Sequence, residues 1–228
     1  MMLDSAVILE RAESALDTAA MDRALDHWAS IQAERPWLFD GPIVAAIVDS
    51  PHSETVTVRW YPSTYSRYLA RDVAGDDGGF DRALFASVVV RSRDGLVLFG
   101  AMADTTSSPG RMQLPGGNVE LASDGSLDEP RIRAEAAREL REETGIAVEP
   151  ATLRPHRVSV GDSYGDVGFL YRYDSELTAS ELLTAVNGEG EFARFVFADP
   201  AEVNATREGH WVDYAEGLLV SLRDEGSA

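Results

Sequence analysis

The chain contains no cysteine among its 228 residues. This absence excludes disulfides, thiol nucleophiles and thiolate metal sites. No apolar run approaches the roughly 20 residues that a membrane-spanning helix requires. The first ten residues also lack the basic stretch that opens a signal peptide. We therefore expect a cytoplasmic protein that has no membrane partner.

Positive charge is scarce as well, because 20 basic residues stand against 39 acidic ones and the formal net charge is −19. Such a surface repels nucleic-acid backbones and anionic membranes, so no nucleic-acid polymer is expected as a partner. A small anionic substrate stays open, because a bound metal and local arginines would attract it. The apolar content of 44% is sufficient for a well-buried core.

One stretch concentrates carboxylates near the end of an expected helix. Residues 138–144 contain neither glycine nor proline, and Gly145 stands where a helix commonly takes its left-handed C′ residue. Helical spacing then places four acids on one face. They are Glu135, Glu139, Glu142 and Glu143.

A row of like charges on a helix costs roughly 0.2–0.5 kcal/mol for each neighbouring pair. A divalent cation would relieve this repulsion, and Mg²⁺ and Mn²⁺ prefer carboxylate oxygens as ligands. The alternative is a solvated acidic face, which is common in a chain this acidic. The spacing alone leaves the two interpretations open.

Hydrophobic periodicity and turn residues predict a mixture of helices and strands. The expected helices cover residues 9–34, 63–70, 179–186 and 210–222, together with the carboxylate helix, whose start fits the capping-box pattern of residues 126–129. The expected strands cover residues 43–48, 55–61, 83–91, 96–102, 153–161, 167–173 and 192–197. Since the order shows no regular βαβ alternation, we predict an α+β fold.

The carboxylate stretch and its glycine-rich entry resemble the Nudix box. That pattern is Gly, five residues, Glu, seven residues, then Arg-Glu-apolar-x-Glu-Glu-x-Gly-apolar. Residues 138–146 match its second half at every defined position, and Gly117 matches its first glycine. The Leu-Pro-Gly-Gly of residues 114–117 and the strands before it are also similar to the family, so the resemblance covers residues 83–203.

The first half of the box departs from the family pattern. The segment from Gly117 to Arg138 is about seven residues longer than usual, so the first box acid would fall at Ser123 or Pro130. Glu129 and Glu120 are the two candidates to replace this acid. The alternative is that no residue replaces it. The insertion spans residues 122–130.

The resemblance implies a Nudix-like α/β/α sandwich with a mixed β-sheet over residues 81–228. Residues 1–80 would form an N-terminal extension of a helix, a β-hairpin and a short helix packed on that domain. Three roles stay open for this extension, namely a substrate lid, a homodimerisation arm and simple core packing. The implied reaction is attack of water on a diphosphate that links a nucleoside to another group, with Mg²⁺ or Mn²⁺ as cofactor.

The resemblance also implies roles for individual residues. Glu139 and Glu143 would be the best pair of metal ligands, and Glu142 would be a third ligand or would orient the water. Arg138 is expected to pair with a carboxylate and hold the helix rather than touch the substrate. A backbone carbonyl of Gly116 or Gly117 would complete the metal shell, since glycine lets the backbone come close.

Several residues outside the box complete the expected site. Many family members take a further acid or base from a late loop, where this chain has Glu189 and Glu191; an ordinary polar hairpin tip is the alternative. Arg111 and Gln113 are expected to hold a phosphate or another polar group. A nucleobase would stack on Trp60 or Tyr65, although most aromatic residues in such a segment belong to the core.

A narrower resemblance concerns the substrate. Residues 36–42, residues 65–69 and the lengthened box are similar to a branch of Nudix hydrolases that cleave UDP-glucose and UDP-galactose. The expected partner is therefore a small nucleoside diphosphate derivative, with a UDP-sugar as the specific form. The alternatives are ADP-ribose or another dinucleotide, and a non-catalytic nucleotide-sugar sensor.

Overall fold

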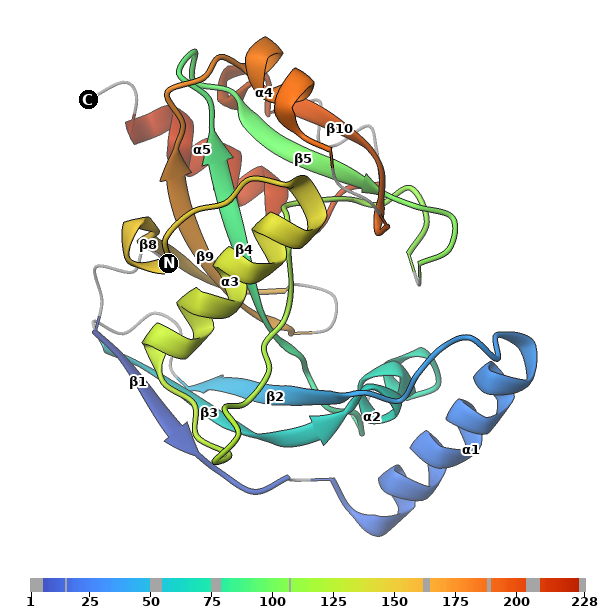
Figure 1. The fold of residues 1–228 in the computed structure, drawn as a ribbon. Helices are drawn as coiled ribbons and strands as arrows, with labels where there is room; N and C mark the ends of the chain where they lie inside the picture. Colours follow the sequence, from blue (N-terminus) through green and yellow to red (C-terminus); the bar gives the residue numbers. More distant parts are fainter. Residues whose placement is uncertain are drawn as a thin grey trace.

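The computed structural model describes residues 6–14, 16–49, 55–74, 79–106, 108–161, 165–187, 190–203 and 210–225 (Figure 1). The strands are β1 (Ala6–Arg11), β2 (Pro42–Asp49), β3 (Thr55–Thr64), β4 (Leu84–Arg91), β5 (Val97–Met102), β6 (Met112–Gln113), β7 (Gly116–Asn118), β8 (Arg154–Val160), β9 (Val167–Asp174) and β10 (Phe192–Ala198). The α-helices are α1 (Thr18–Glu34), α2 (Tyr65–Leu69), α3 (Glu129–Thr144), α4 (Ala179–Ala185) and α5 (Ala215–Glu225). Short 3-10 turns cover Ala70–Asp72 and Pro150–Thr152.

The larger sheet has the strand order β10-β5-β4-β9-β8. The central strands β4 and β9 run parallel, whereas β10–β5, β4–β5 and β8–β9 are antiparallel, so the sheet is mixed. The short strands β6 and β7 join it beside β5 and β4, respectively. This arrangement puts the glycine-rich entry of the box directly on the central strand.

Helices cover both faces of this sheet (Figure 1). Alternate residues of β4 point to opposite sides, as a strand requires. Leu84 and Val88 pack in one cluster with Leu140 of α3, whereas Val89 packs in the other cluster with Leu218 of α5. The predicted α/β/α sandwich with a mixed sheet is confirmed.

The N-terminal region, residues 6–80, has a smaller sheet of its own with the order β1-β3-β2. The predicted hairpin is present as antiparallel β2 and β3. Side chains of these strands, including Val44, Val56 and Trp60, belong to the same core cluster as α3. Helix α1 contacts α2 at its buried Trp28, whose ring meets Tyr65 edge to face. The N-terminal region is therefore packed on the larger domain.

Two expected helix starts are wrong. Residues 9–11 belong to strand β1, because Leu9 pairs in parallel with Val58 of β3, and such a long-range partner leaves no mark on local periodicity. Helix α5 begins at Ala215 rather than at residue 210, because Trp211 instead bridges to Met112 at the edge of the sheet.

The start of α3 also differs from the capping-box prediction. Asp128 caps the helix by accepting a hydrogen bond from the N–H of Arg131 at 2.8 Å. Ser126 instead donates to Asp124 in the preceding turn. Pro130 is tolerated because the first-turn N–H groups of a helix have no intrahelical partner. In the described part of the chain, no helix is long and apolar enough to cross a membrane.

Candidate active site

The end of helix α3 fixes the position of the carboxylates. Gly145 ends the helix with φ of 75°, and its N–H bonds to the carbonyl of Arg141. A side chain at this position would overlap the amide oxygen of Asn187, which approaches from the loop after α4. Glycine is therefore required here both by the backbone angle and by the neighbouring loop.

Arg138 holds three carboxylates of α3, which range from buried to half-exposed. Its guanidinium nitrogens lie 2.7 Å from Glu135, 2.6 Å from Glu139 and 2.7 Å from Glu142. Glu142 is the most exposed of the three and is turned toward Arg138. The arginine thus neutralises much of the repulsion that the sequence pattern predicts.

Glu143 lies on the inner side of the same helix and is 6% exposed. One carboxylate oxygen, Oε2, accepts a hydrogen bond from the N–H of Gly116 at 2.7 Å. The other, Oε1, is buried and has no partner among the described residues. The pKa of Glu143 is raised to about 9, mainly by burial and also by the nearby charges of Glu191, Glu139 and Glu142, although the hydrogen bond from the Gly116 N–H lowers it.

The two glycines of the entry bring strand β7 against both the sheet and the helix. Gly116 pairs with Ser87 of β4 at φ of 151°, and a Cβ there would overlap the carbonyl oxygen of Ala86. A Cβ on Gly117 would lie 2.8 Å from the carboxyl carbon of Glu139. Only glycine allows this approach, so the backbone comes close to the acids of α3.

The late acid also lies near this group. Glu191 raises the pKa of both Glu139 and Glu143, after the larger effect of burial in each case. Its carbonyl accepts a hydrogen bond from the N–H of Ala103 at 2.7 Å, which ties the loop to the end of β5. Glu189, the other expected acid, lies outside the described residues.

A cavity of about 800 Å³ opens above these acids. Glu139, Glu191 and both glycines line its floor. Arg111 and Gln113 line it from the larger domain, and Tyr65 lines it from α2. Three of the four expected substrate residues are therefore brought to one cavity with the carboxylates.

Trp60 is the exception and corrects the prediction. Its side chain is only 4% exposed and belongs to the core between the two sheets. The guanidinium of Arg11 lies over its ring, 5.6 Å from the centroid. A ring enclosed in this way offers no face to a nucleobase.

The structure distinguishes between the two candidates for replacing the first box acid. Glu129 is held by Arg133 through hydrogen bonds of 2.8 to 3.0 Å at the start of α3, and it does not line the cavity. Glu120 does line the cavity. Position in space therefore favours Glu120, although Glu129 lies nearer in sequence to the expected place.

Sequence reasoning missed several wall residues. Phe39, Tyr68 and Arg71 come from the N-terminal region, and Phe85 and Tyr214 come from the larger domain. Arg71 lies over the ring of Tyr68, 3.8 Å from its centroid. An aromatic residue beside a basic one was the available signal, but local sequence does not show which ring faces a cavity.

Comparison with known proteins identifies the family. The model of the NUDIX domain matches residues 81–219. The chain belongs to the Nudix family. No curated protein matches this chain.

Solved structures with similar folds are distant in sequence. The MutT protein from Methanosarcina mazei Go1 is 17% identical, with 64% of this chain and 96% of that chain covered and a TM-score of 0.44. The NUDIX domain of Shewanella oneidensis NrtR, complexed with ADP ribose, is 16% identical, with 72% and 99% covered and a TM-score of 0.47. A bifunctional NMN adenylyltransferase/ADP ribose pyrophosphatase from Francisella tularensis, complexed with AMP and a Mn ion, is 16% identical, with 63% and 42% covered and a TM-score of 0.48.

Nudix hydrolases generally use divalent metals, and the residues of this site fit such an ion. The buried Oε1 of Glu143 is a hard oxygen ligand that lacks a partner among the described residues. The acids around it raise its pKa, which shows an excess of negative charge. Within the described ranges, no three His, Asp or Glu side chains already surround one point. Arg138 holds two of the expected ligands, Glu139 and Glu142, toward itself.

Proposed function

We propose that this Nudix hydrolase cleaves the diphosphate of a nucleoside diphosphate derivative in a reaction that requires Mg²⁺ or Mn²⁺. The observation that carries the proposal is the buried Oε1 of Glu143, which has no partner among the described residues, on a carboxylate bonded to Gly116 of the cavity lining. A diphosphate is anionic, so it cannot rest directly against Glu139, Glu143 and Glu191. A bound divalent cation would neutralise this contact and act as a Lewis acid on the phosphate.

Each residue of the floor then has a role. Glu139 and Glu143 would hold the cation, together with a backbone carbonyl of Gly116 or Gly117. Glu142 would serve as a third ligand or would orient the attacking water. Arg138 itself keeps the carboxylates in place and does not touch the substrate.

The cavity walls bind the substrate. Arg111 and Gln113 contact the phosphates or another polar group, and Tyr65 offers a ring to the nucleobase. Glu191, or Glu189 from the same loop, accepts the proton of the attacking water. The water oxygen forms a bond to one phosphorus while the bridging P–O bond breaks, so two phosphate monoesters leave.

For the substrate itself we propose a UDP-sugar, which would yield UMP and a sugar 1-phosphate. Support comes from the similarity of residues 36–42 and 65–69 to the branch that cleaves UDP-glucose and UDP-galactose. The first of these segments lies at the cavity with Phe39, and the second with Tyr65. ADP-ribose or another dinucleotide is the alternative substrate.

The deciding experiment is a panel of nucleoside diphosphate derivatives. UDP-glucose, UDP-galactose, ADP-ribose and a dinucleotide are incubated with the full chain and Mg²⁺ or Mn²⁺, and the released nucleotide is measured. Addition of EDTA should abolish turnover. Turnover of ADP-ribose but no UDP-sugar would overturn the narrower substrate, and no turnover of any compound would favour a sensor on this fold.

A further inference from the structure

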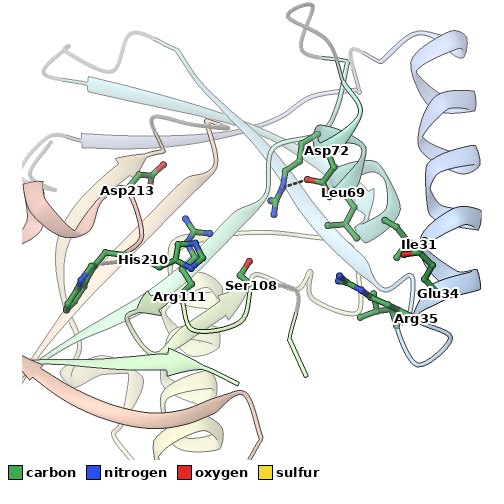
Figure 2. Close-up of a pocket in the computed structure, with 12 residues that line it drawn as sticks. Ile31, Glu34, Arg35, Leu69, Asp72, Ser108, Arg111, His210 and Asp213 are labelled. Carbon is green, nitrogen blue, oxygen red and sulfur yellow. Dashed lines mark ion pairs between the residues drawn. The ribbon is translucent and has the colours of Figure 1, made fainter. Parts of the chain in front are cut away.

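A second cavity adjoins the active site on the side of the N-terminal region. We name it the outer chamber; it has a volume of about 500 Å³. The residues that line it and not the first cavity include Ile31, Glu34, Arg35, Leu69, Asp72 and His210. Figure 2 shows α1 on one side of this chamber and the residues of the larger domain on the other.

The outer chamber and the active-site cavity share part of their lining. Arg71, Ser108, Arg111 and Asp213 line both spaces. Arg71 comes from the N-terminal region and Arg111 from the larger domain, so two guanidinium groups flank the passage. A substrate with its diphosphate near the carboxylates could extend between these two groups into the outer chamber.

Ion pairs and hydrogen bonds hold the side chains on the Arg71 side of this passage. Arg71 lies 3.7 Å from Asp72 and 3.8 Å from Asp166, and its side chain is 9% exposed. Asp166 also accepts hydrogen bonds from the hydroxyl of Tyr68 and the N–H of Ala83. These contacts bind the 3-10 turn after α2 to the start of strand β4. The shape of the passage is thereby set by the packing of the N-terminal region.

The outer chamber has an even balance of charge, unlike the chain as a whole. Its lining includes the guanidinium groups of three arginines and the carboxylates of three acids. The arginines are Arg35, Arg71 and Arg111, and the acids are Glu34, Asp72 and Asp213. The full chain has almost twice as many acidic as basic residues. A lining of this kind favours a ligand that carries no net charge.

The same lining is rich in both donors and acceptors. A guanidinium can only donate hydrogen bonds and an ionised carboxylate can only accept them, whereas a hydroxyl group does both. The aromatic rings of Phe39, Tyr65 and Phe85 line the first cavity, where a base would stack, and Trp211 lines the outer chamber beside its charged groups. The two spaces therefore suit the two ends of a substrate that differ in chemistry.

We propose that the outer chamber is the subsite for the group beyond the diphosphate, and that this group is uncharged and rich in hydroxyls. The proposal rests on the proposed hydrolysis of a nucleoside diphosphate derivative. Glu34 and Arg35, at the end of α1, determine specificity from the far wall. Figure 2 shows Arg35 pointing from the end of this helix into the space toward Ser108.

The test compares ligands that differ only beyond the diphosphate. Binding of UDP, UDP-glucose, UDP-glucuronate, ADP and ADP-glucose is measured by calorimetry with Mg²⁺, using Glu191→Gln to suppress turnover while keeping the proposed metal ligands. Initial rates for the sugar conjugates are measured with the unsubstituted chain. We expect each glucose conjugate to bind about tenfold more tightly than the bare diphosphate of the same base, since hydroxyls gain partners in the outer chamber.

Substitutions in the outer chamber then locate this gain. The pair Glu34→Gln and Arg35→Gln, introduced together, should reduce the ratio between glucose conjugate and bare diphosphate to near one. Arg194→Gln is the matched control, because Arg194 is an exposed arginine on β10 outside both cavities, and it should keep the full ratio. Thermal melting checks that each variant is folded.

The outcomes separate this proposal from the proposed function. Turnover of the conjugates with no gain from the sugar, or a gain that survives in the double variant, would overturn the subsite and leave the hydrolase. Tighter binding of UDP-glucuronate than of UDP-glucose would overturn the uncharged class and indicate an anion subsite. Failure to bind or turn over any compound would overturn the hydrolase proposal and the subsite together.

Discussion

Each half of helix α3 carries one buried carboxylate, and the two carboxylates differ in their partners. Glu135, in the first half, is 3% exposed and Glu143, in the second half, is 6% exposed. Arg131 and Arg138 each lie 2.7 Å from the carboxylate of Glu135. Glu143 has a single hydrogen bond, from the N–H of Gly116, and no arginine contacts it among the described residues.

Burial alone therefore does not mark a functional acid. A buried carboxylate with two arginine partners is compensated, and removing its charge alone destabilises the fold because the arginines lose their partner. A buried carboxylate without a full set of partners is costly, and such a cost is commonly retained where chemistry requires it. Glu143 meets this second description, and its hydrogen-bond donor Gly116 lines the cavity, whereas the two arginines that hold Glu135 do not line it.

The sharpest test of this contrast is Glu143→Gln. The amide oxygen of glutamine can still accept the hydrogen bond from Gly116, but the carboxylate that would bind a cation is lost. We expect kcat to fall by about 10²–10⁴-fold, as for loss of an essential catalytic group, while the melting temperature stays the same or rises. Steady-state kinetics and thermal melting measure both. Near-normal activity would mean that the functional acid has been misassigned.

The converse substitution, Glu135→Gln, should lower the stability of the fold and leave kcat unchanged. Two arginines lose a buried carboxylate, but both are about one-third exposed and regain water. We expect the free energy of unfolding to fall by about 2–3 kcal/mol, somewhat below the usual cost of breaking a buried ion pair. Urea unfolding measures this loss. A large fall in kcat of the folded variant, with unchanged stability, would contradict the assignment.

A third substitution probes the contact between strand and helix. In Gly117→Ala the new methyl group would crowd the carboxylate of Glu139, which is the movable end of a side chain. The fold should tolerate this shift, whereas activity should fall about tenfold because the metal ligands are displaced, as with loss of a supporting contact. Activity is measured against Mg²⁺ concentration, and we expect a higher requirement. Equal activity at every Mg²⁺ concentration would exclude Glu139 as a ligand.

The smallest effect concerns another buried group outside the cavity, His156. Its Nε2 is also buried and has no partner among the described residues. Burial lowers its pKa below the ordinary 6.5, although the charge of Glu225 partly opposes this effect. The unfolded chain then takes up the proton first, so this stability is complete above about pH 6.5 and is lost as the pH falls toward the lower folded pKa.

His156→Gln should therefore make stability less dependent on pH between 7 and 5, with no change in kcat. Melting temperatures of both proteins across this range measure the difference. That result, set beside a loss of activity in Glu143→Gln, would mean that a buried polar atom without a partner marks a functional site only next to a cavity. An unchanged slope would show that His156 does not contribute to acid sensitivity.

The sequence by itself determined the parts of this protein that depend on local spacing. Gly145 ends α3 as predicted, because only glycine adopts the required positive φ at little cost. The order of glutamates at residues 139, 142 and 143 identified the family before any fold was known. The β-branched runs also located strands β2 to β5, since alternation and turn residues are local signals.

Tertiary structure decided what long-range contacts control. Strand β1 exists because β3 lies beside it, and Trp60 is closed off by the core that both sheets share. Arg138 forms an ion pair with Glu142, which the shared helix face did not indicate. The cavity walls combine residues 39 and 65–71 with residues 111–120 and 212–214. Burial and the meeting of distant segments depend on the whole packed chain, so no local pattern specifies them.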